Sequence, residues 1–217
     1  MSLMVFDKVF RDFEDGDNVI HALQETSFSL EAGEFVAIVG PSGSGKSTLL
    51  TLMGGLQRPS GGEIYLDGKS YHDLSQEDLI NFRFTEIGFI LQSSNLVPYL
   101  TLAEQFRLVD LYAKRPHDKE RAQNLMESLG IAKLANAYPT DMSGGERQRA
   151  AICRALYTEP SLILADEPTA SLDTEKAFEV IKIISEKTKK NKIAAVMVTH
   201  DRRLLDYVDR VFEVTDG

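Results

Sequence analysis

The stretch GPSGSGKST, residues 40–48, directly follows the apolar segment EFVAIV, residues 34–39. Gly40, four residues, and then Gly45-Lys46-Ser47 match the phosphate-binding loop pattern. Glycines let backbone N–H groups converge on phosphate oxygens, and the helix that follows directs its positive end at them. Lys46 is expected to reach the β and γ phosphates, and Ser47 is expected to bind Mg²⁺. The predicted nucleotide-binding loop also contains Pro41, Ser42, Gly43, Ser44 and Thr48.

An acidic segment downstream supplies the carboxylates that a phosphate loop alone lacks. In LILADEP, residues 162–168, an apolar run ends at Asp166 and Glu167. A carboxylate at the tip of a buried strand beside a phosphate loop is suited to holding Mg²⁺, which assigns Asp166 to the metal. Glu167 is expected to orient and deprotonate the attacking water. The sequence therefore predicts a nucleotide hydrolysis site.

The order of expected elements predicts an α/β fold. β structure is expected over 3–10 and 26–40 with a turn or loop at 12–18 between them, and several later apolar strands alternate with helices. This alternation favours a mainly parallel sheet covered on both faces. Residues 101–134 have helical spacing and no strand signal, which predicts an inserted helical subdomain. We expect one domain over 1–217, with a core of 1–92 and 158–217 and the helical subdomain at about 93–157.

Composition narrows the class of protein. The chain has 217 residues and a formal net charge of -9, which argues against nonspecific nucleic-acid binding. Cys153 is the single cysteine, so no intrachain disulfide forms and a reducing cytoplasm is expected. No apolar run approaches the roughly 20 residues of a membrane-spanning helix, so we expect membrane association only through a partner.

Three further stretches name a family. They are MSGGERQRAAICRAL (142–156), LILADEPTASLD (162–173) and VMVTHD (196–201). Together with the phosphate loop, they make essentially the whole chain resemble the ATP-binding subunit of an ABC (ATP-binding cassette) transporter. The resemblance implies a P-loop NTPase core, an N-terminal antiparallel β subdomain, and a helical insertion. It also implies ATP and Mg²⁺ as cofactors, and it argues against a soluble P-loop kinase, which needs no signature motif.

The resemblance implies that each site is shared between two copies of the chain. Ser143, Gly144 and Gly145 match the signature motif, which contacts the γ phosphate held by the opposite subunit. Met142 stands in place of the usual leucine, and Glu146 in place of the commonest glutamine. A head-to-tail dimer with ATP between the subunits is expected.

The remaining motif positions also receive roles from the resemblance. Gln92 is expected to touch Mg²⁺ and water, and its loop to sense the membrane partner. Asp173 is expected near the dimer interface, where it can also cap a helix, and His200 near the γ phosphate. Phe13 is expected to stack on adenine, because stacking needs only the ring face. Phe10 competes for that role, and a core position is open to either residue.

The likeness extends to a group within the family. The chain looks like the MacB/LolD-type ATPases, and residues 87–105 and 198–211 look closest to haem-efflux ATPase subunits of Gram-positive bacteria. We therefore expect an ATPase on the inner face of the cell membrane, bound to a permease that exports haem. Export of antimicrobial peptides, lipids or lipoproteins is the second interpretation. A repair or ribosome-acting ATPase of the same superfamily is the third.

Overall fold

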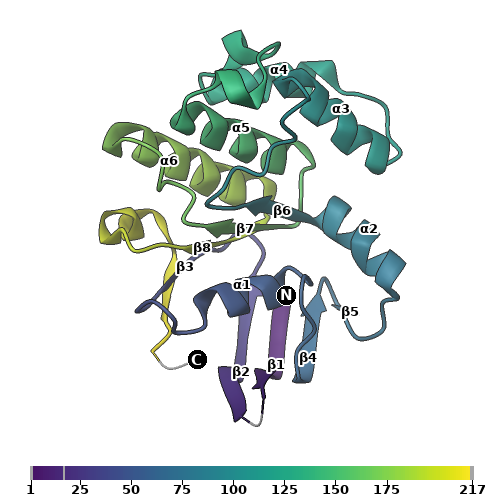
Figure 1. Cartoon of the computed structure of the whole chain (residues 1–217), viewed down its shortest axis with the longest axis vertical. Coiled ribbons are helices and arrows are strands. Elements are labelled where there is room, and N and C mark those ends of the chain that lie inside the picture. The colour runs from purple at the N-terminus through teal and green to yellow at the C-terminus, as the bar shows by residue number, and fades with distance from the viewer. Residues whose placement is uncertain (1, 17, 216–217) are drawn as a thin grey trace.

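The computed structural model describes residues 2–16 and 18–215, and it contains two sheets (Figure 1). The antiparallel sheet comprises β1 (Ser2–Asp15), β2 (Asn18–Glu31), β4 (Gly61–Leu66) and β5 (Lys69–Ser70), in the order β2-β1-β4-β5. The expected N-terminal antiparallel subdomain is confirmed. The turn or loop expected at 12–18 is shorter than predicted, because β1 continues to Asp15, β2 begins at Asn18, and Phe13 pairs with Ile20. Cross-strand hydrogen bonds outweigh the poor strand propensity of this acidic segment.

The parallel sheet has the order β6-β7-β8-β3-β9, and every neighbouring pair in it is parallel. Its strands are β3 (Phe35–Val39), β6 (Ile87–Ile90), β7 (Leu162–Asp166), β8 (Ala194–Val198) and β9 (Arg210–Glu213). The segment 26–40, expected to be β, therefore contains parts of two strands, β2 and β3, in different sheets. A turn containing Gly33, whose φ is +86°, separates them.

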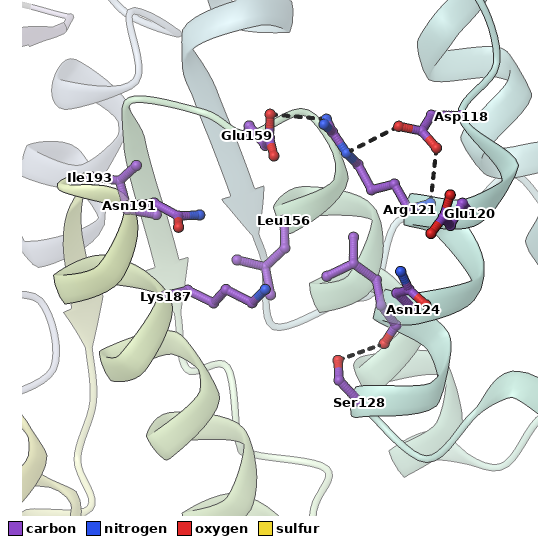
Figure 2. A pocket seen from close by; sticks show the side chains of 11 residues that line it. Asp118, Glu120, Arg121, Asn124, Ser128, Leu156, Glu159, Lys187, Asn191 and Ile193 are labelled. Atoms are coloured by element: carbon purple, nitrogen blue, oxygen red, sulfur yellow. Dashed lines mark hydrogen bonds and ion pairs between the residues drawn. The ribbon is translucent and has the colours of Figure 1, made fainter.

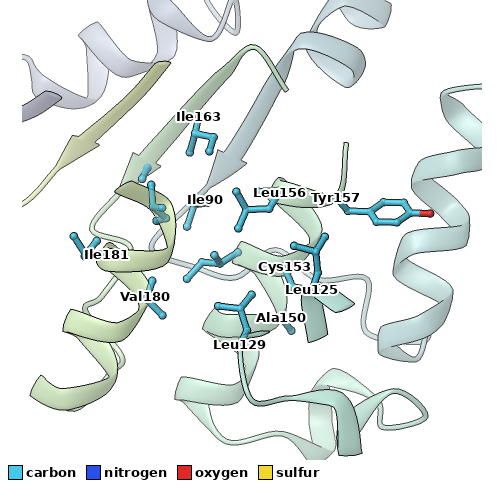
Figure 3. Packing of buried hydrophobic residues seen from close by; sticks show 14 of the residues in the cluster. Ile90, Leu125, Leu129, Ala150, Cys153, Leu156, Tyr157, Ile163, Val180 and Ile181 are labelled. Atoms are coloured by element: carbon cyan, nitrogen blue, oxygen red, sulfur yellow. The ribbon is translucent and has the colours of Figure 1, made fainter. Parts of the chain in front are cut away.

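Helices cover both faces of the parallel sheet, as expected. On one face lies α1 (Lys46–Met53), and on the other lie α5 (Gly144–Tyr157) and α6 (Thr174–Asn191) (Figure 1). Successive strand residues point to opposite faces. Val36 and Ile38 join the cluster that contains α1, whereas Phe35 and Ala37 join the cluster around α5 and α6. Figure 3 shows this second cluster, in which Cys153 is buried.

The middle of the chain is helical. Residues 91–161, all of which the structure describes, contain α3 (Leu102–Tyr112), α4 (Lys119–Ser128), η1 (Ala132–Leu134), η2 (Pro139–Asp141) and α5, with no strand. Both α3 and α4 pack against α5. The two remaining helices are α2 (Gln76–Glu86) and the short η3 (Arg202–Tyr207). The boundaries of the core and the helical subdomain as separate units stay a prediction.

Candidate active site

The phosphate loop has a backbone that only glycine permits at its first position. Gly40 has a φ of +154°, and a Cβ there would lie 2.0 Å from the Val214 carbonyl oxygen. Gly45, with a φ of 91°, is the N-cap of α1, and no side chain caps this helix end. The first N–H groups of α1 therefore remain available to an anion, as the sequence predicts.

Lys46 is buried at the start of α1 and turns back onto the loop. Its Nζ donates to the carbonyl oxygens of Gly40, at 3.0 Å, and Pro41, at 2.5 Å. Ser44 Oγ is buried without a hydrogen-bond partner among the described residues. Ser47 on the same turn is exposed. The loop thus holds an ammonium and an unsatisfied hydroxyl close to the exposed start of the helix.

Two neighbouring strands bring the acidic pair and the histidine together. In the parallel pairing of β7 with β8, Asp166 lies opposite Val198. The chain after Val198 leads to His200, whose Nε2 lies 3.6 Å from Glu167 Oε1. The Glu167 N–H donates to the Val198 carbonyl oxygen at 3.0 Å. Glu167 has a φ of 47°, a left-handed conformation that is uncommon for a residue with a side chain and often accompanies function.

Burial shifts the pKa of both carboxyl groups of this acidic pair. Burial raises the pKa of Asp166 above its usual value, and Lys46 and His200 oppose that shift. Burial also raises the pKa of Glu167, with His200 opposing and Asp166 adding to the shift. Glu167 Oε1 is buried and accepts no hydrogen bond from the described residues. Lys46, Asp166, Glu167 and His200 therefore form one electrostatically coupled group, of the kind found at functional sites.

The signature segment is built as a helix start. Ser143 is the N-cap of α5 and forms a reciprocal capping box with Glu146. A Cβ on Gly145 would lie 3.2 Å from Leu172 Cδ2, so the segment 171–173 packs close to the signature glycines. Asp173 caps α6 by accepting from the Lys176 N–H at 2.9 Å. In the part of the chain that the structure describes, no hydrogen bond or ion pair joins Ser143 to the phosphate loop.

Gln92 lies in an exposed segment after β6, and two buried amides hold that segment in place. Gln148 of α5 donates to the Leu91 carbonyl oxygen at 3.3 Å. Gln105 of α3 donates to the carbonyl oxygens of Val97 and Leu100, and its own oxygen accepts from the Val97 N–H. Sequence reasoning missed both amides. Their position on the inward face of helices was the available signal.

Phe13 and Phe10 differ in their surroundings. Phe13 is partly exposed on β1, and the Arg11 guanidinium lies 4.5 Å from its ring centroid. The Phe10 ring lies against Gly61, where a Cβ would approach to 2.3 Å. This packing leaves Phe13 as the better candidate for stacking on a base.

A separate cavity of about 340 Å³ lies between α4 and the C-terminal ends of α5 and α6 (Figure 2). Its lining includes Leu125 and Leu156, and Arg121 pairs there with Glu159 at 3.1 Å. None of the predicted site residues lines this cavity. It is therefore distinct from the phosphate-loop site.

A sequence model of the ABC transporter family matches residues 23–170, more than half of the chain. The chain belongs to the ABC transporter family. It is 44% identical, over 96% of its length and 95% of the relative's, to a protein of Staphylococcus haemolyticus named, with a provisional qualifier, hemin import ATP-binding protein HrtA. A Staphylococcus aureus protein with the same name is 43% identical over 100% of this chain and 98% of the relative.

Solved structures agree with the family. A dimeric ATP-binding cassette, MJ0796, in a post-hydrolysis state bound to ADP and Pi superposes with a TM-score of 0.92 at 34% identity, covering 99% of this chain and 95% of that chain. The cbiO1 subunit of an ABC transporter complex from Clostridium perfringens has a TM-score of 0.83 at 30% identity, covering 98% and 84%.

These findings identify the chain as the ATP-binding, ATP-hydrolysing subunit of an ABC transporter. The names of the staphylococcal relatives state import, so the efflux expected from the sequence is not supported. Within residues 2–16 and 18–215, no helix has both the length and the apolar character needed to cross a bilayer.

Proposed function

We propose that two copies of this chain close around two ATP molecules with Mg²⁺, and that hydrolysis powers a membrane permease for haem. The observation that carries the hydrolytic part is the grouping of Lys46, Asp166, Glu167 and His200 beside the start of α1. An anion-binding helix start, an ammonium, a metal-type carboxylate and a partly buried base are the parts that in-line phosphoryl transfer requires.

Glu167 acts as the general base. Its Oε1 has no hydrogen-bond donor among the described residues, so it is available to accept a proton from water. The water oxygen attacks the γ phosphorus, the bond to the ADP oxygen breaks, and phosphate leaves. His200, whose Nε2 lies 3.6 Å from Glu167 Oε1, orients the carboxylate and faces the developing charge. Lys46 exchanges its two loop carbonyls for phosphate oxygens.

The donor set fits Mg²⁺. The described residues contain no cluster of three or more His, Cys, Asp and Glu side chains, which a metal held by protein alone would need. Mg²⁺ instead takes one or two protein oxygens and completes its shell with phosphates and water. The Ser47 hydroxyl, the Asp166 carboxylate and the Gln92 amide offer oxygens of this kind. When bound there, the ion would neutralise charge on the β and γ phosphates.

The second copy completes the site. The start of α5, formed by Ser143, Gly144 and Gly145, lies on the opposite face of the sheet from α1 (Figure 1). One chain therefore supplies its phosphate loop to one nucleotide and its signature motif to the other. Phe13 stacks on adenine, and Asp173, packed beside the signature glycines, lies at the interface. The dimeric state of the cassette with ADP and Pi supports this arrangement.

The catalytic assignment is tested by Glu167→Gln, with Glu213→Gln as the matched control at the exposed end of β9, the edge strand of the same sheet. A general base contributes about 10²- to 10⁴-fold to the rate. We expect Glu167→Gln to lose phosphate release by at least that factor while ATP binding persists, and the control to hydrolyse normally. Normal turnover in Glu167→Gln would remove Glu167 from the mechanism.

The permease docks in a groove of about 390 Å³ between α2, β6, α3 and α5. Phe84 of α2 and Tyr112 of α3 line it, 41% and 59% exposed, with their rings stacked at 5.0 Å between centroids. Aromatic side chains are enriched at protein–protein interfaces, so an apolar cytoplasmic segment of the permease is the expected occupant.

The groove is connected to the Gln92 segment. Gln105 lines the groove and also clamps residues 97–100. Arg154 lines it too and donates to the Asn95 carbonyl oxygen at 2.9 Å. A partner that fills the groove therefore touches the residues that position Gln92. Phe84→Ala and Tyr112→Ala should each lose copurification with the permease, whereas Leu111→Ala, 74% exposed outside the groove, should retain it.

Haem as the cargo is supported by the names of relatives that match over essentially their whole length. The test is growth of the source cell, deleted for this gene, across a haemin series, with rescue by the wild type or Glu167→Gln. Greater haemin sensitivity after deletion indicates efflux, and loss of haemin use as an iron source indicates import. No change in either measurement would reject haem.

A further inference from the structure

The signature serine is already engaged within its own chain. The Ser143 hydroxyl donates to Glu146 Oε2 at 2.9 Å, and the same carboxylate oxygen accepts the Ser143 N–H at 3.0 Å. Ser143 Oγ in turn accepts from the Glu146 N–H at 3.3 Å. A serine hydroxyl has one hydrogen, so it cannot donate to Glu146 and to a phosphate at the same time.

The engaging group carries a negative charge. Hydrogen bonds from the Ser143 backbone and side chain lower the pKa of Glu146, and Lys133 and Arg149 contribute in the same direction. The carboxylate is therefore ionised at neutral pH. A phosphate oxygen bound to the Ser143 hydroxyl at the usual distance would lie within about 6 Å of the carboxylate oxygen. Closure thus brings a second anion close to Glu146.

We infer that Glu146 is a positioning residue that sets the ATP concentration at which two copies of the chain close. Its carboxylate holds the Ser143 hydroxyl on the α5 cap and repels the incoming γ phosphate. Closure must break one charge-assisted hydrogen bond and overcome this repulsion at each of two sites. The inference rests on the proposed ATP-sandwich dimer and adds a threshold ATP concentration for its formation.

Glu146→Gln isolates the charge. Glutamine serves in a capping box as glutamate does, so the α5 start is retained. The chain also offers a matched control, because Thr101 and Glu104 form the same capping box on α3 with bonds of 2.8 Å from the Thr101 N–H and hydroxyl. Glu104→Gln makes the same change in net charge and in cap chemistry away from the predicted nucleotide site.

The experiment measures ATP-dependent dimerisation by sedimentation in the Glu167→Gln background, which prevents turnover. Repulsion between a carboxylate and a phosphate at this separation in water corresponds to about three- to tenfold per site. We expect Glu146→Gln to lower the half-maximal ATP concentration for dimer formation by about that factor, with ADP affinity of the monomer unchanged. The shift should shrink at 1 M salt, and Glu104→Gln should show none.

The outcomes separate the inference from the function on which it rests. An ATP-dependent dimer with the same midpoint in Glu146→Gln and its parent would overturn the role of Glu146 alone. An equal shift in Glu104→Gln, or a shift that persists at 1 M salt, would also overturn it. If no variant dimerises with ATP, both the inference and the proposed dimer fail.

Discussion

Replacing Tyr157 by phenylalanine should destabilise the helical part of the chain measurably. Tyr157 is fully buried at the end of α5, and its hydroxyl donates to Asp110 Oδ2 at 2.5 Å. Asp110, with a side chain 2% exposed, also accepts from Arg115 Nε at 2.6 Å and binds His117 Nδ1 at 2.8 Å. The substitution removes one donor from a buried charge and the acceptor of the Asp118 N–H, and it keeps the ring packed against Phe106.

The expected loss is about 2 kcal/mol. Hydrogen bonds to charged groups contribute about 1.5–3 kcal/mol, and the two remaining donors keep Asp110 from being left unpaired. Ring burial is nearly unchanged, so no large cavity term is added. Such a loss is a substantial part of the roughly 5–15 kcal/mol that stabilises a typical domain.

The pH dependence of the stability difference tests the prediction in a second way. Burial raises the pKa of Asp110, but hydrogen bonds from Tyr157, His117 and Arg115 outweigh burial and leave the pKa below its usual value. A lowered folded-state pKa contributes stability above the unfolded value of about 3.9, and that stability disappears as the pH falls through the folded value. The difference between wild type and Tyr157→Phe should therefore be full at pH 7 and shrink below about pH 4.

Urea unfolding followed by circular dichroism measures the difference. Burial is the largest of the effects that raise the pKa of Tyr157 to about 12, so the hydroxyl stays protonated in this range. Tyr99→Phe is the control, because Tyr99 is 77% exposed and its change should cost almost nothing. A loss below about 0.5 kcal/mol for Tyr157→Phe, or an equal loss for Tyr99→Phe, would refute the reasoning.

Three further substitutions have clear directions. Because burial raises the pKa of Glu167, its ionised form destabilises the folded state at pH 7. Glu167→Gln should therefore unfold at a higher urea concentration at pH 7, and this gain should vanish toward about pH 4. An unchanged urea midpoint at pH 7 would contradict this prediction. Gly88→Ala places a Cβ 2.7 Å from the Ala155 carbonyl oxygen, so thermal unfolding should show a loss of about 1–3 kcal/mol, and a neutral result would mean that β6 and α5 separate easily. Ser75→Ala removes the acceptor for the Asp78 N–H at the start of α2 and should lower the free energy of unfolding by about 1 kcal/mol in the same assay. An unchanged stability would show that water replaces this cap without loss.

The phosphate loop and its neighbours could be predicted because their chemistry is local. A strand, a glycine-rich turn and a helix start occupy consecutive residues, so the structure of residues 35–53 can be predicted from that segment alone. The adjacency of Glu167 and His200 is different, since it depends on β7 pairing with β8. Sequence reasoning reached it through two apolar strands ending in polar residues, together with the family resemblance.

Other features depend on tertiary contacts that the sequence does not announce. The extension of β1 through Phe13 to Asp15 follows from pairing with β2, although the segment DFEDGDN has the composition of a loop. Gln105 and Gln148 are buried because the segment around Gln92 presents backbone carbonyls that need donors. Irregular backbone has no periodicity, so its partners cannot be found from the spacing of residues.

The separation of the two anion-binding helix starts is the strongest argument for cooperation between copies. The start of α1 and the start of α5 lie on helices that cover opposite faces of one parallel sheet (Figure 1). Each helix packs in its own core cluster, and in the described part of the chain no hydrogen bond joins Ser143 to the phosphate loop. If both helix starts bind the same phosphate, one of them must come from a second chain. Hydrolysis is then expected to depend on protein concentration, with activity per chain rising steeply until the dimer is saturated.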